Sequence, residues 1–381
     1  MRPLLLDHFG NASSIHQQGQ HARAAVDHAR DAMARLLHAR ASEIVFTSGG
    51  TESDNLALFG VLKPGDHLIT SAIEHHAVLH AAEALAHRGV EVTLLPCDLH
   101  GVVSPASLTD ALRPHTRLVS IMFANNETGT IQPIAALSQI AKNHGVLFHT
   151  DAVQAAGKLP LDLSATGALQ HVDLLSIAGH KMYAPQGIGV LFVRRNVRLA
   201  PLFHGGTHER QRRAGTENVA SIVALGKAAE LAQTWLTKGA SESEVASGPK
   251  VLTALRDRLE QTLLAGIAEC GVNGAANERT SNTSNLYFDH VEAEALVIAL
   301  DLKGLSVSGG SACQSGATEP SHVLTAMGLS PARARASVRF SLSRMSTQQD
   351  VDDALEIIPS AVSRLRSLSP TWKASLALAS A

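Results

Sequence analysis

The sequence is poor in aromatic residues and carries almost no excess of charge of either sign. Phe, Trp and Tyr make up 3% of its 381 residues although 45% are hydrophobic, so the core must consist mainly of Leu, Ala, Val and Ile. This composition is typical of stacked helices and strands, and it excludes disorder as the dominant state. The 32 Lys and Arg residues nearly balance 34 Asp and Glu residues, giving a formal net charge of -2. Binding to nucleic acid or to an anionic membrane surface through bulk charge is therefore disfavoured.

Cysteines are also scarce and widely spaced. Cys97, Cys270 and Cys313 cannot form a CxxC motif, and any disulfide scheme leaves one of them unpaired. We therefore expect a reducing compartment and a cytoplasmic protein. The first residues hold only a four-residue apolar stretch that Asp7 ends, which predicts neither a signal peptide nor a membrane span. No membrane association is expected.

Short apolar runs alternate with segments of helical spacing along the first 200 residues. Seven runs rich in β-branched residues are predicted strands: Ile44–Thr47, His67–Thr70, Val90–Leu95, Leu118–Met122, Val146–Thr150, Leu174–Ile177 and Gly189–Val193. Ala- and Leu-rich segments between them are predicted helices: Ala22–Leu37, Thr51–Phe59, Ala77–His87 and Ile134–His144. The alternation predicts an α/β fold whose mostly parallel, seven-stranded sheet is covered on both faces.

The length predicts two domains. Residues 238–250 are rich in Gly, Ser, Ala and Glu, as in a loose connection, and we place the boundary there. The prediction is a large domain over 1–237 and a smaller C-terminal α/β domain over 238–381, with packing of the first residues against the small domain as an alternative.

A glycine-rich turn follows the first predicted strand. Residues 47–52 read TSGGTE and lead directly into a predicted helix, where free backbone N–H groups can bind an anion such as phosphate. An ordinary strand-to-helix turn explains the same residues. No G-x-G-x-x-G motif follows this strand, so a nicotinamide enzyme is disfavoured.

An acid and a lysine follow two later strands. Asp151 ends the strand that begins at Val146, and Lys181 comes shortly after Ile177. Ligands collect at the carboxyl edge of a parallel sheet. Pyridoxal phosphate needs a lysine that can form a Schiff base and a carboxylate that keeps its pyridine nitrogen protonated. A helix cap and a solvated lysine are the ordinary readings of each residue alone.

Nine motifs stand in one order along the chain: FGNASSIH (9–16), EIVFTSGGTESDN (43–55), EHHAV (74–78), NNETG (125–129), HTDAVQAAGKLP (149–160), AGHKMYAPQGIG (178–189), HGGTHERQRRAGTENV (204–219), SGGSACQSG (308–316) and VRFSLSR (338–344). With them the sequence resembles the pyridoxal-phosphate cysteine desulfurases of the nitrogenase-type and iron-sulfur-cluster-assembly group. These belong to the class V aminotransferases and have fold type I, a large cofactor-binding domain and a small domain that carries a cysteine loop.

The resemblance implies a role for each matching residue. Lys181 would form the Schiff base with the cofactor and Asp151 would pair with its ring nitrogen. Gln154 would bind the ring hydroxyl, while His75 would stack on the ring and move protons. The other residues implied in cofactor binding are Gly50, Thr51, Asn126, His180 and, from the partner subunit of a homodimer with shared active sites, Thr216.

The resemblance also implies the reaction. Cys313 would be the nucleophile that takes sulfur from L-cysteine as a persulfide, with release of L-alanine, and would pass it to an acceptor such as an iron-sulfur scaffold protein. Arg339 and Asn126 would bind the substrate carboxylate, a task suited to guanidinium. Cys97 and Cys270 are expected to be buried structural thiols.

Three other functions stay open. A selenocysteine lyase or a class V aminotransferase would share the lysine, the acid and the phosphate loop, although an aminotransferase does not need Cys313. The third is a non-catalytic homologue that acts as an assembly partner.

Two departures from the family pattern bear on cofactor binding. Only eight residues precede Phe9, where the family has a strand and a D-x-(N/S)-A-T-T segment that lines the pocket. Ala178 replaces a phosphate-contacting serine, and the missing charge-assisted hydrogen bond would be worth about 1.5–3 kcal/mol. We therefore expect weaker cofactor retention. No metal site is predicted, because glycines 205 and 206 disfavour a helix that would align His204 and His208.

Overall fold

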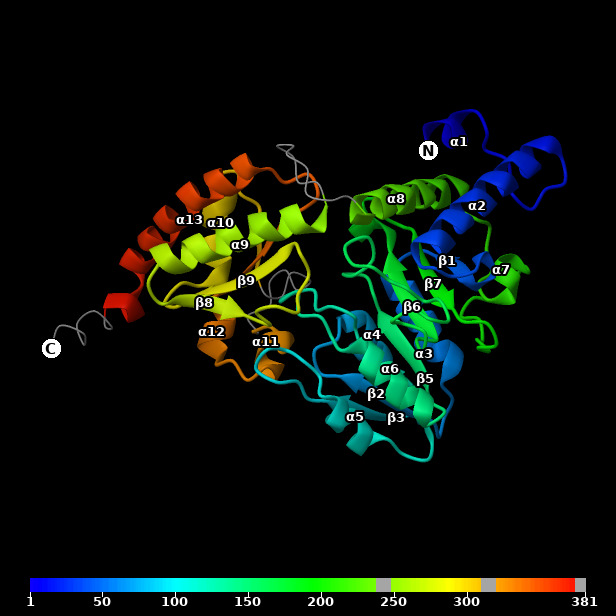
Figure 1. The fold of residues 1–381 in the computed structure, drawn as a ribbon, viewed down its shortest axis with the longest axis horizontal. Coiled ribbons are helices and arrows are strands. Elements are labelled where there is room, and N and C mark those ends of the chain that lie inside the picture. Colours follow the sequence, from blue (N-terminus) through cyan, green and yellow to red (C-terminus); the bar gives the residue numbers. More distant parts are fainter. Residues whose placement is uncertain (238–247, 310–319, 374–381) are drawn as a thin grey trace. The chain divides into compact units, whose positions relative to one another are not determined.

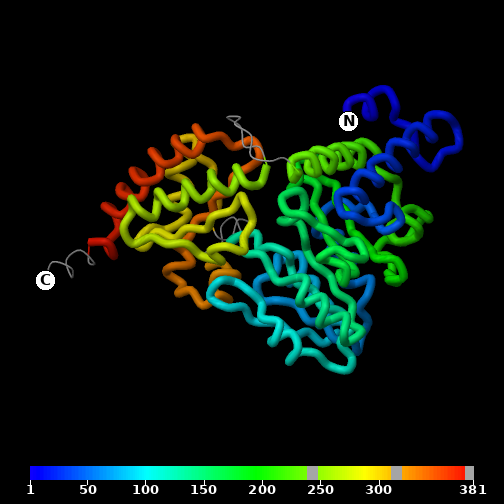
Figure 2. Tube along the Cα trace, viewed as in Figure 1, coloured from blue at the N-terminus to red at the C-terminus, as the bar shows by residue number. Residues whose placement is uncertain are grey.

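The computed structural model describes residues 1–237, 248–309 and 320–373. The chain forms two compact units (Figures 1 and 2). Unit 1 comprises Met1–Pro96, Val103–Ala124 and Gln132–Thr237, and unit 2 comprises Cys97–Val102, Asn125–Ile131 and Lys238–Ala381. Two short segments of the first 237 residues thus cluster with unit 2, and the assignment of cofactor binding to the large domain stays a prediction.

Unit 1 is built on a seven-stranded sheet with the order β1-β7-β6-β5-β4-β2-β3. The strands are β1 (Ile44–Thr47), β2 (His67–Ser71), β3 (Glu91–Leu95), β4 (Thr116–Ser120), β5 (Leu147–Asp151), β6 (Leu174–Ala178) and β7 (Gly189–Val193). All pairings are parallel except those of β7, which runs antiparallel to β1 and β6. The predicted fold is therefore confirmed, with strand ends that differ by one or two residues.

Helices and two short 3-10 turns complete unit 1 (Figure 1): α1 (Arg2–Leu6), α2 (Gln17–Leu36), η1 (Ala41–Glu43), α3 (Gly50–Val61), α4 (His76–Ala86), α5 (Pro105–Ala111), α6 (Ile134–Asn143), η2 (Gly179–Met182), α7 (His208–Gln211) and α8 (Val219–Thr237). Helix α2 begins five residues before its predicted start, because His16 Nδ1 accepts the Gly19 N–H at 3.2 Å and caps it. Helices α3 and α4 cover one face of the sheet over a core of aliphatic side chains such as Leu56, Leu68 and Leu174. Helix α3 also carries a buried acid, Asp54.

Unit 2 contains a four-stranded antiparallel sheet with the order β10-β11-β9-β8. Its strands are β8 (Cys270–Asn273), β9 (Thr283–Phe288), β10 (Ser308–Gly309) and β11 (Ser337–Ser341). Its helices are α9 (Pro249–Gly266), α10 (Ala293–Asp301), α11 (His322–Ala326), α12 (Pro331–Arg335) and α13 (Gln348–Leu368). In the part of the chain that the structure describes, no helix is long and apolar enough to span a membrane.

A buried ion pair joins α2 to the turn at α7. Arg30 donates to both carboxylate oxygens of Glu209 at 2.7 Å, and the Phe46 N–H donates to Glu209 at 3.1 Å. Both side chains are at most 6% exposed. Glu209 and the two residues after it have left-handed φ angles of 47°, 56° and 66°, which are unfavourable for residues other than glycine. The ion pair therefore holds a strained turn.

Removing one partner of this pair should strongly destabilise unit 1. Glu209→Gln leaves the Arg30 charge buried without its carboxylate, so we expect the free energy of unfolding to fall by about 3–5 kcal/mol. Chemical denaturation measures the loss. Glu230→Gln is the matched control, because Glu230 pairs with exposed Lys227 and should change stability by only about 0–1 kcal/mol. Equal losses in both variants would contradict the prediction.

Candidate active site

The glycine-rich turn (47–52) lies close to residues of two other motifs, Val153 of the motif 149–160 and Ala178 of the motif 178–189. Helix α3 begins at Gly50, directly after β1 and the turn. A Cβ atom on Gly50 would lie 2.8 Å from Val153 Cγ2 and 3.5 Å from Ala178 Cβ. The first distance is too short and the second is an ordinary contact, so the close approach of the Val153 side chain favours glycine at position 50. Thr51 follows in the first turn of α3.

Glu52 ties this turn to the segment that contains Thr216. Its carboxylate accepts the Ser48 N–H at 2.8 Å and Arg213 Nε at 2.9 Å. Burial raises the pKa of Glu52, but the hydrogen bonds from Arg213 and Ser48 outweigh it, and the net pKa is lowered. Ser48 and Thr216 line one small hollow of about 200 Å³. Delivery of Thr216 to a partner subunit stays a prediction.

Asp151 and Lys181 lie at one edge of the sheet. Asp151 ends β5 and pairs in register with Ser176 of β6, which leads within five residues to Lys181 on η2. The Val153 N–H donates to Asp151 Oδ1 at 2.8 Å. Burial raises the pKa of Asp151 to about 6. A carboxyl group, a lysine and a glycine cradle at this edge fit the ring, aldehyde and phosphate of pyridoxal phosphate.

His180 and Gln154 lie close in sequence to Lys181 and Asp151, and each has its own contacts. His180 precedes Lys181, and its pKa is lowered by partial burial and then by the Lys181 charge. Gln154, the predicted partner of the ring hydroxyl, accepts a hydrogen bond from Lys158 Nζ at 3.0 Å. The cofactor-binding roles of His180 and Gln154 stay predictions.

His75 is fixed at the start of α4. Its Nδ1 accepts the Ala77 N–H at 3.1 Å, which leaves Nε2 to carry the proton of the neutral ring. The preceding Glu74 is fully buried, and its Oε1 accepts the Ser71 hydroxyl at 2.6 Å and the Met122 N–H at 2.8 Å. Glu74 thereby anchors the chain between β2 and His75 to the end of β4.

A third buried acid, Asp54, was missed by the sequence reasoning. His149 lies two residues before Asp151 on β5, so both face α3. Its ring nitrogens contact the Ser120 hydroxyl at 2.8 Å and the Ser176 hydroxyl at 3.0 Å, and Nε2 lies 3.7 Å from Asp54 Oδ1. Burial and then the Asp151 charge raise the pKa of Asp54, while burial lowers the pKa of His149 to about 3. The strand alternation could have placed His149, but not Asp54.

The predicted substrate clamp lies in unit 2. Arg339 on β11 donates through Nη1 to the backbone oxygen of Asn126 at 2.8 Å. The structure thus brings the two predicted clamp residues together within this unit. Cys313 lies outside the described residues.

Cys97 and Cys270 were expected to be buried, and the structure shows that this expectation is wrong. Both are half-buried free thiols, and Cys270 begins the edge strand β8. Burial raises the pKa of both thiols, which disfavours the reactive thiolate. Among the described residues no group of three His, Cys, Asp or Glu side chains could hold a metal ion.

Comparison with known proteins identifies similar chains along nearly the whole length. Residues 1–354 match the class-V aminotransferase family. A cysteine desulfurase IscS from Methanosarcina thermophila is 48% identical over 97% of this chain and 89% of its own. A cysteine desulfurase from Nostoc sp. is 48% identical over 97% of this chain and 90% of its own.

Solved structures show the same similarity. A NifS-like protein has a TM-score of 0.85 and 34% identity, covering 95% of this chain and 94% of its own. A structure described as SspA in complex with cysteine has a TM-score of 0.77 and 36% identity, covering 91% of this chain and 94% of its own.

Burial of Glu74 should appear in the pH dependence of stability. Its pKa is raised by burial from 4.5 to about 8, so the folded protein holds its proton through a pH range in which the unfolded chain loses it. The free energy of unfolding therefore falls as pH rises through this range. Glu74→Gln keeps the Oε1 acceptor but cannot ionise. Its free energy of unfolding should therefore rise relative to that of wild type by about 1–3 kcal/mol as pH increases from 5 to 8.5.

Chemical denaturation of the cofactor-free protein at several pH values measures this effect. Glu83→Gln, at an exposed position of α4, is the control and should follow the wild-type curve. A Glu74→Gln curve parallel to that of wild type would refute the expectation.

Proposed function

This chain belongs to the class-V aminotransferase family, among its cysteine desulfurases, and from this premise we propose that it takes the sulfur of L-cysteine as a persulfide on Cys313 and releases L-alanine. The meeting of Gly50, Asp151 and the Lys181 turn at one sheet edge carries the proposal, because pyridoxal phosphate needs these three groups together. The similar structure described with cysteine supports the choice of substrate.

Bound pyridoxal phosphate supplies an electron sink for negative charge that develops on the substrate. Lys181 would hold the cofactor covalently until the substrate amine displaces it, and its released amine could then accept the α-proton. The buried Asp151 carboxylate would hold a proton at the ring nitrogen. Gly50, Thr51, His180 and the partner's Thr216 would bind the phosphate.

The remaining steps fall to the substrate clamp, His75 and Cys313. Arg339 and Asn126 would orient the substrate by its carboxylate. The Cys313 thiolate would attack the substrate sulfur, so an S–S bond forms while the C–S bond breaks, and the carbon skeleton takes a proton before alanine leaves. Nε2 of His75 carries an exchangeable proton and suits this transfer.

Delivery to an acceptor protein such as an iron-sulfur scaffold, a homodimer with shared sites and a cytoplasmic location complete the proposal. They are supported by the family motifs and by the scattered cysteines. Selenocysteine lyase activity is the second candidate, because it would use the same residues. Parallel assays with cysteine, selenocysteine and a keto acid distinguish desulfurase, lyase and aminotransferase, and a protein inactive in all three would be a non-catalytic homologue.

The roles of the lysine and the cysteine are tested by one pair of variants. Lys181→Ala should lose the visible Schiff-base band of the purified protein, because no other group replaces the covalent link. Cys313→Ser should keep that band but lose persulfide formation and sulfide release. Absorbance spectra and alanine and sulfide assays check both. Full sulfide release by Cys313→Ser would overturn the role of Cys313.

Restoring the missing hydroxyl at position 178 should strengthen cofactor binding. Ala178 is buried at the end of β6 beside the glycine cradle. Ala178→Ser should lower the dissociation constant for pyridoxal phosphate about tenfold, the lower end of the effect of a hydrogen bond to a charged group. Titration of cofactor-free protein measures it, with Ala72→Ser directly after β2 as the control. An unchanged dissociation constant would show that position 178 does not contact the phosphate.

A further inference from the structure

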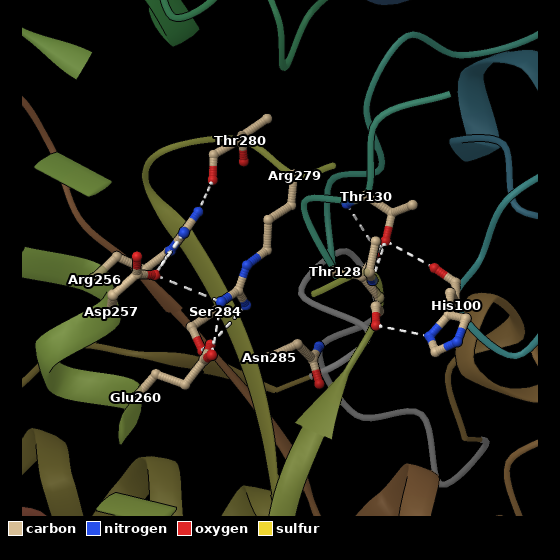
Figure 3. Close-up of polar contacts among 12 residues, drawn as sticks. His100, Thr128, Thr130, Arg256, Asp257, Glu260, Arg279, Thr280, Ser284 and Asn285 are labelled. Atoms are coloured by element: carbon tan, nitrogen blue, oxygen red, sulfur yellow. Dashed lines mark hydrogen bonds and ion pairs between the residues drawn. The ribbon is translucent and has the colours of Figure 1, made fainter. Parts of the chain in front are cut away.

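The segment that contains Asn126 is held on unit 2 by the chain that leads into β9. Thr280 N–H donates to the Gly129 backbone oxygen at 2.9 Å, and Gly129 has a left-handed φ of 78°. On the other side of the segment, Thr130 donates to the His100 backbone oxygen at 2.9 Å, as Figure 3 shows. Asn126 and its neighbour Glu127 therefore have a fixed place in unit 2.

The chain that leads into β9 is itself anchored by an ion pair. The Glu260 carboxylate of α9 accepts hydrogen bonds from Arg279 Nη1, from Arg279 Nη2 and from the Ser284 hydroxyl, each at 2.6 Å (Figure 3). Asn285, next on β9, donates through Nδ2 to the Glu127 backbone oxygen at 3.2 Å and pairs in register with Arg339 of β11. Strand β9 thus contacts both the backbone of residues 125–131 and the strand that carries Arg339.

Glu127 connects β9 to the chain that follows Cys313. Its side chain is only 4% exposed, and its Oε2 accepts the Ser321 hydroxyl at 2.6 Å. Ser321 lies eight residues after Cys313 and caps α11 by accepting the Leu324 N–H. No role in the proposed reaction described above uses Glu127, although it is adjacent to Asn126.

The groups around Glu127 make its charge sensitive to pH near neutrality. Burial raises its pKa to about 7, against the Ser321 hydrogen bond and the Arg339 charge, which lower it. Ser321 at the N-cap of α11, Asn285 from β9 and Asn125 within its own segment are neutral contacts. In the described part of the chain, Arg339 is the charged group that acts on Glu127.

We propose that Glu127 is a positioning residue of the substrate site, whose carboxylate competes with the substrate carboxylate for the Arg339 charge while its hydrogen bond to Ser321 holds the start of α11. This inference rests on the proposed function, because Arg339 is a clamp only if the substrate is an amino acid. Proton uptake by Glu127 releases the Arg339 charge to the substrate. Binding of an amino-acid carboxylate should therefore weaken as pH rises through the ionisation of Glu127.

L-Alanine is the probe, because it carries the amine and carboxylate of L-cysteine without the reacting sulfur. Calorimetric titration of the protein loaded with pyridoxal phosphate gives its dissociation constant from pH 6 to 8.5. Glu127→Gln keeps an oxygen for Ser321 but cannot ionise. We expect this variant to bind L-alanine about threefold to tenfold more tightly than wild type at pH 8.5, and equally at pH 6.

Ser321→Ala provides an independent test of the same contact. It removes a donor that lowers the pKa of Glu127, so the pH at which alanine binding weakens should move upward. Glu294→Gln, at an exposed position of α10, is the control and should match wild type. Michaelis constants for L-cysteine should follow the same pattern, with little change in turnover at saturation.

Two results would overturn the inference. One is a Glu127→Gln variant with the pH dependence of wild type, and the other is an unshifted Ser321→Ala profile, which applies even if Glu127→Gln does not fold. Failure of the proposed function looks different: wild type would then bind L-alanine no better than ethylamine, which lacks the carboxylate, and would release no alanine from L-cysteine.

Discussion

Three carboxyl groups buried close together cannot all be ionised, and the candidate site is organised around this constraint. Asp54, Glu74 and Asp151 each have a raised pKa, first of all because water is excluded from them, and the charge of Asp151 raises the pKa of the other two. His149 lies between hydroxyls of β4 and β6, the two strands that flank β5; it stays neutral and adds no compensating charge. The pKa of Asp151, about 6, is lower than that of Glu74, about 8, which suits Asp151 to face a protonated ring.

The features that followed from the sequence are those coded by short, local patterns. Strand periodicity located the seven strands of unit 1, and strand ends located Asp151 and Lys181. The need for glycine at position 50 came from motif alone, and the structure supplies its physical reason in the close approach of Val153. The antiparallel direction of β7 was not predicted, since periodicity carries no information on strand direction.

The features that were missed depend on packing between distant segments. Asp54 becomes a neighbour of Asp151 only because α3 crosses β5, and Glu127 meets Ser321 across 194 positions of sequence. The transfer of residues 125–131 to unit 2 likewise rests on bonds to the segment 278–285. A single boundary after residue 237 could not predict this exchange. Composition indicates where a linker lies, but it does not indicate which earlier segments pack with the later unit.

The pairing of α2 with α8 joins residues 17–36 to residues 219–237 within unit 1. During synthesis the apolar side of α2, which includes Val26, Ala29 and Met33, is made long before the helix that covers it. Unit 1 therefore has high contact order, and its folding must wait for some two hundred residues to leave the ribosome. A chain stalled before α8 would expose this side of α2, so truncated products are expected to aggregate or to need a chaperone.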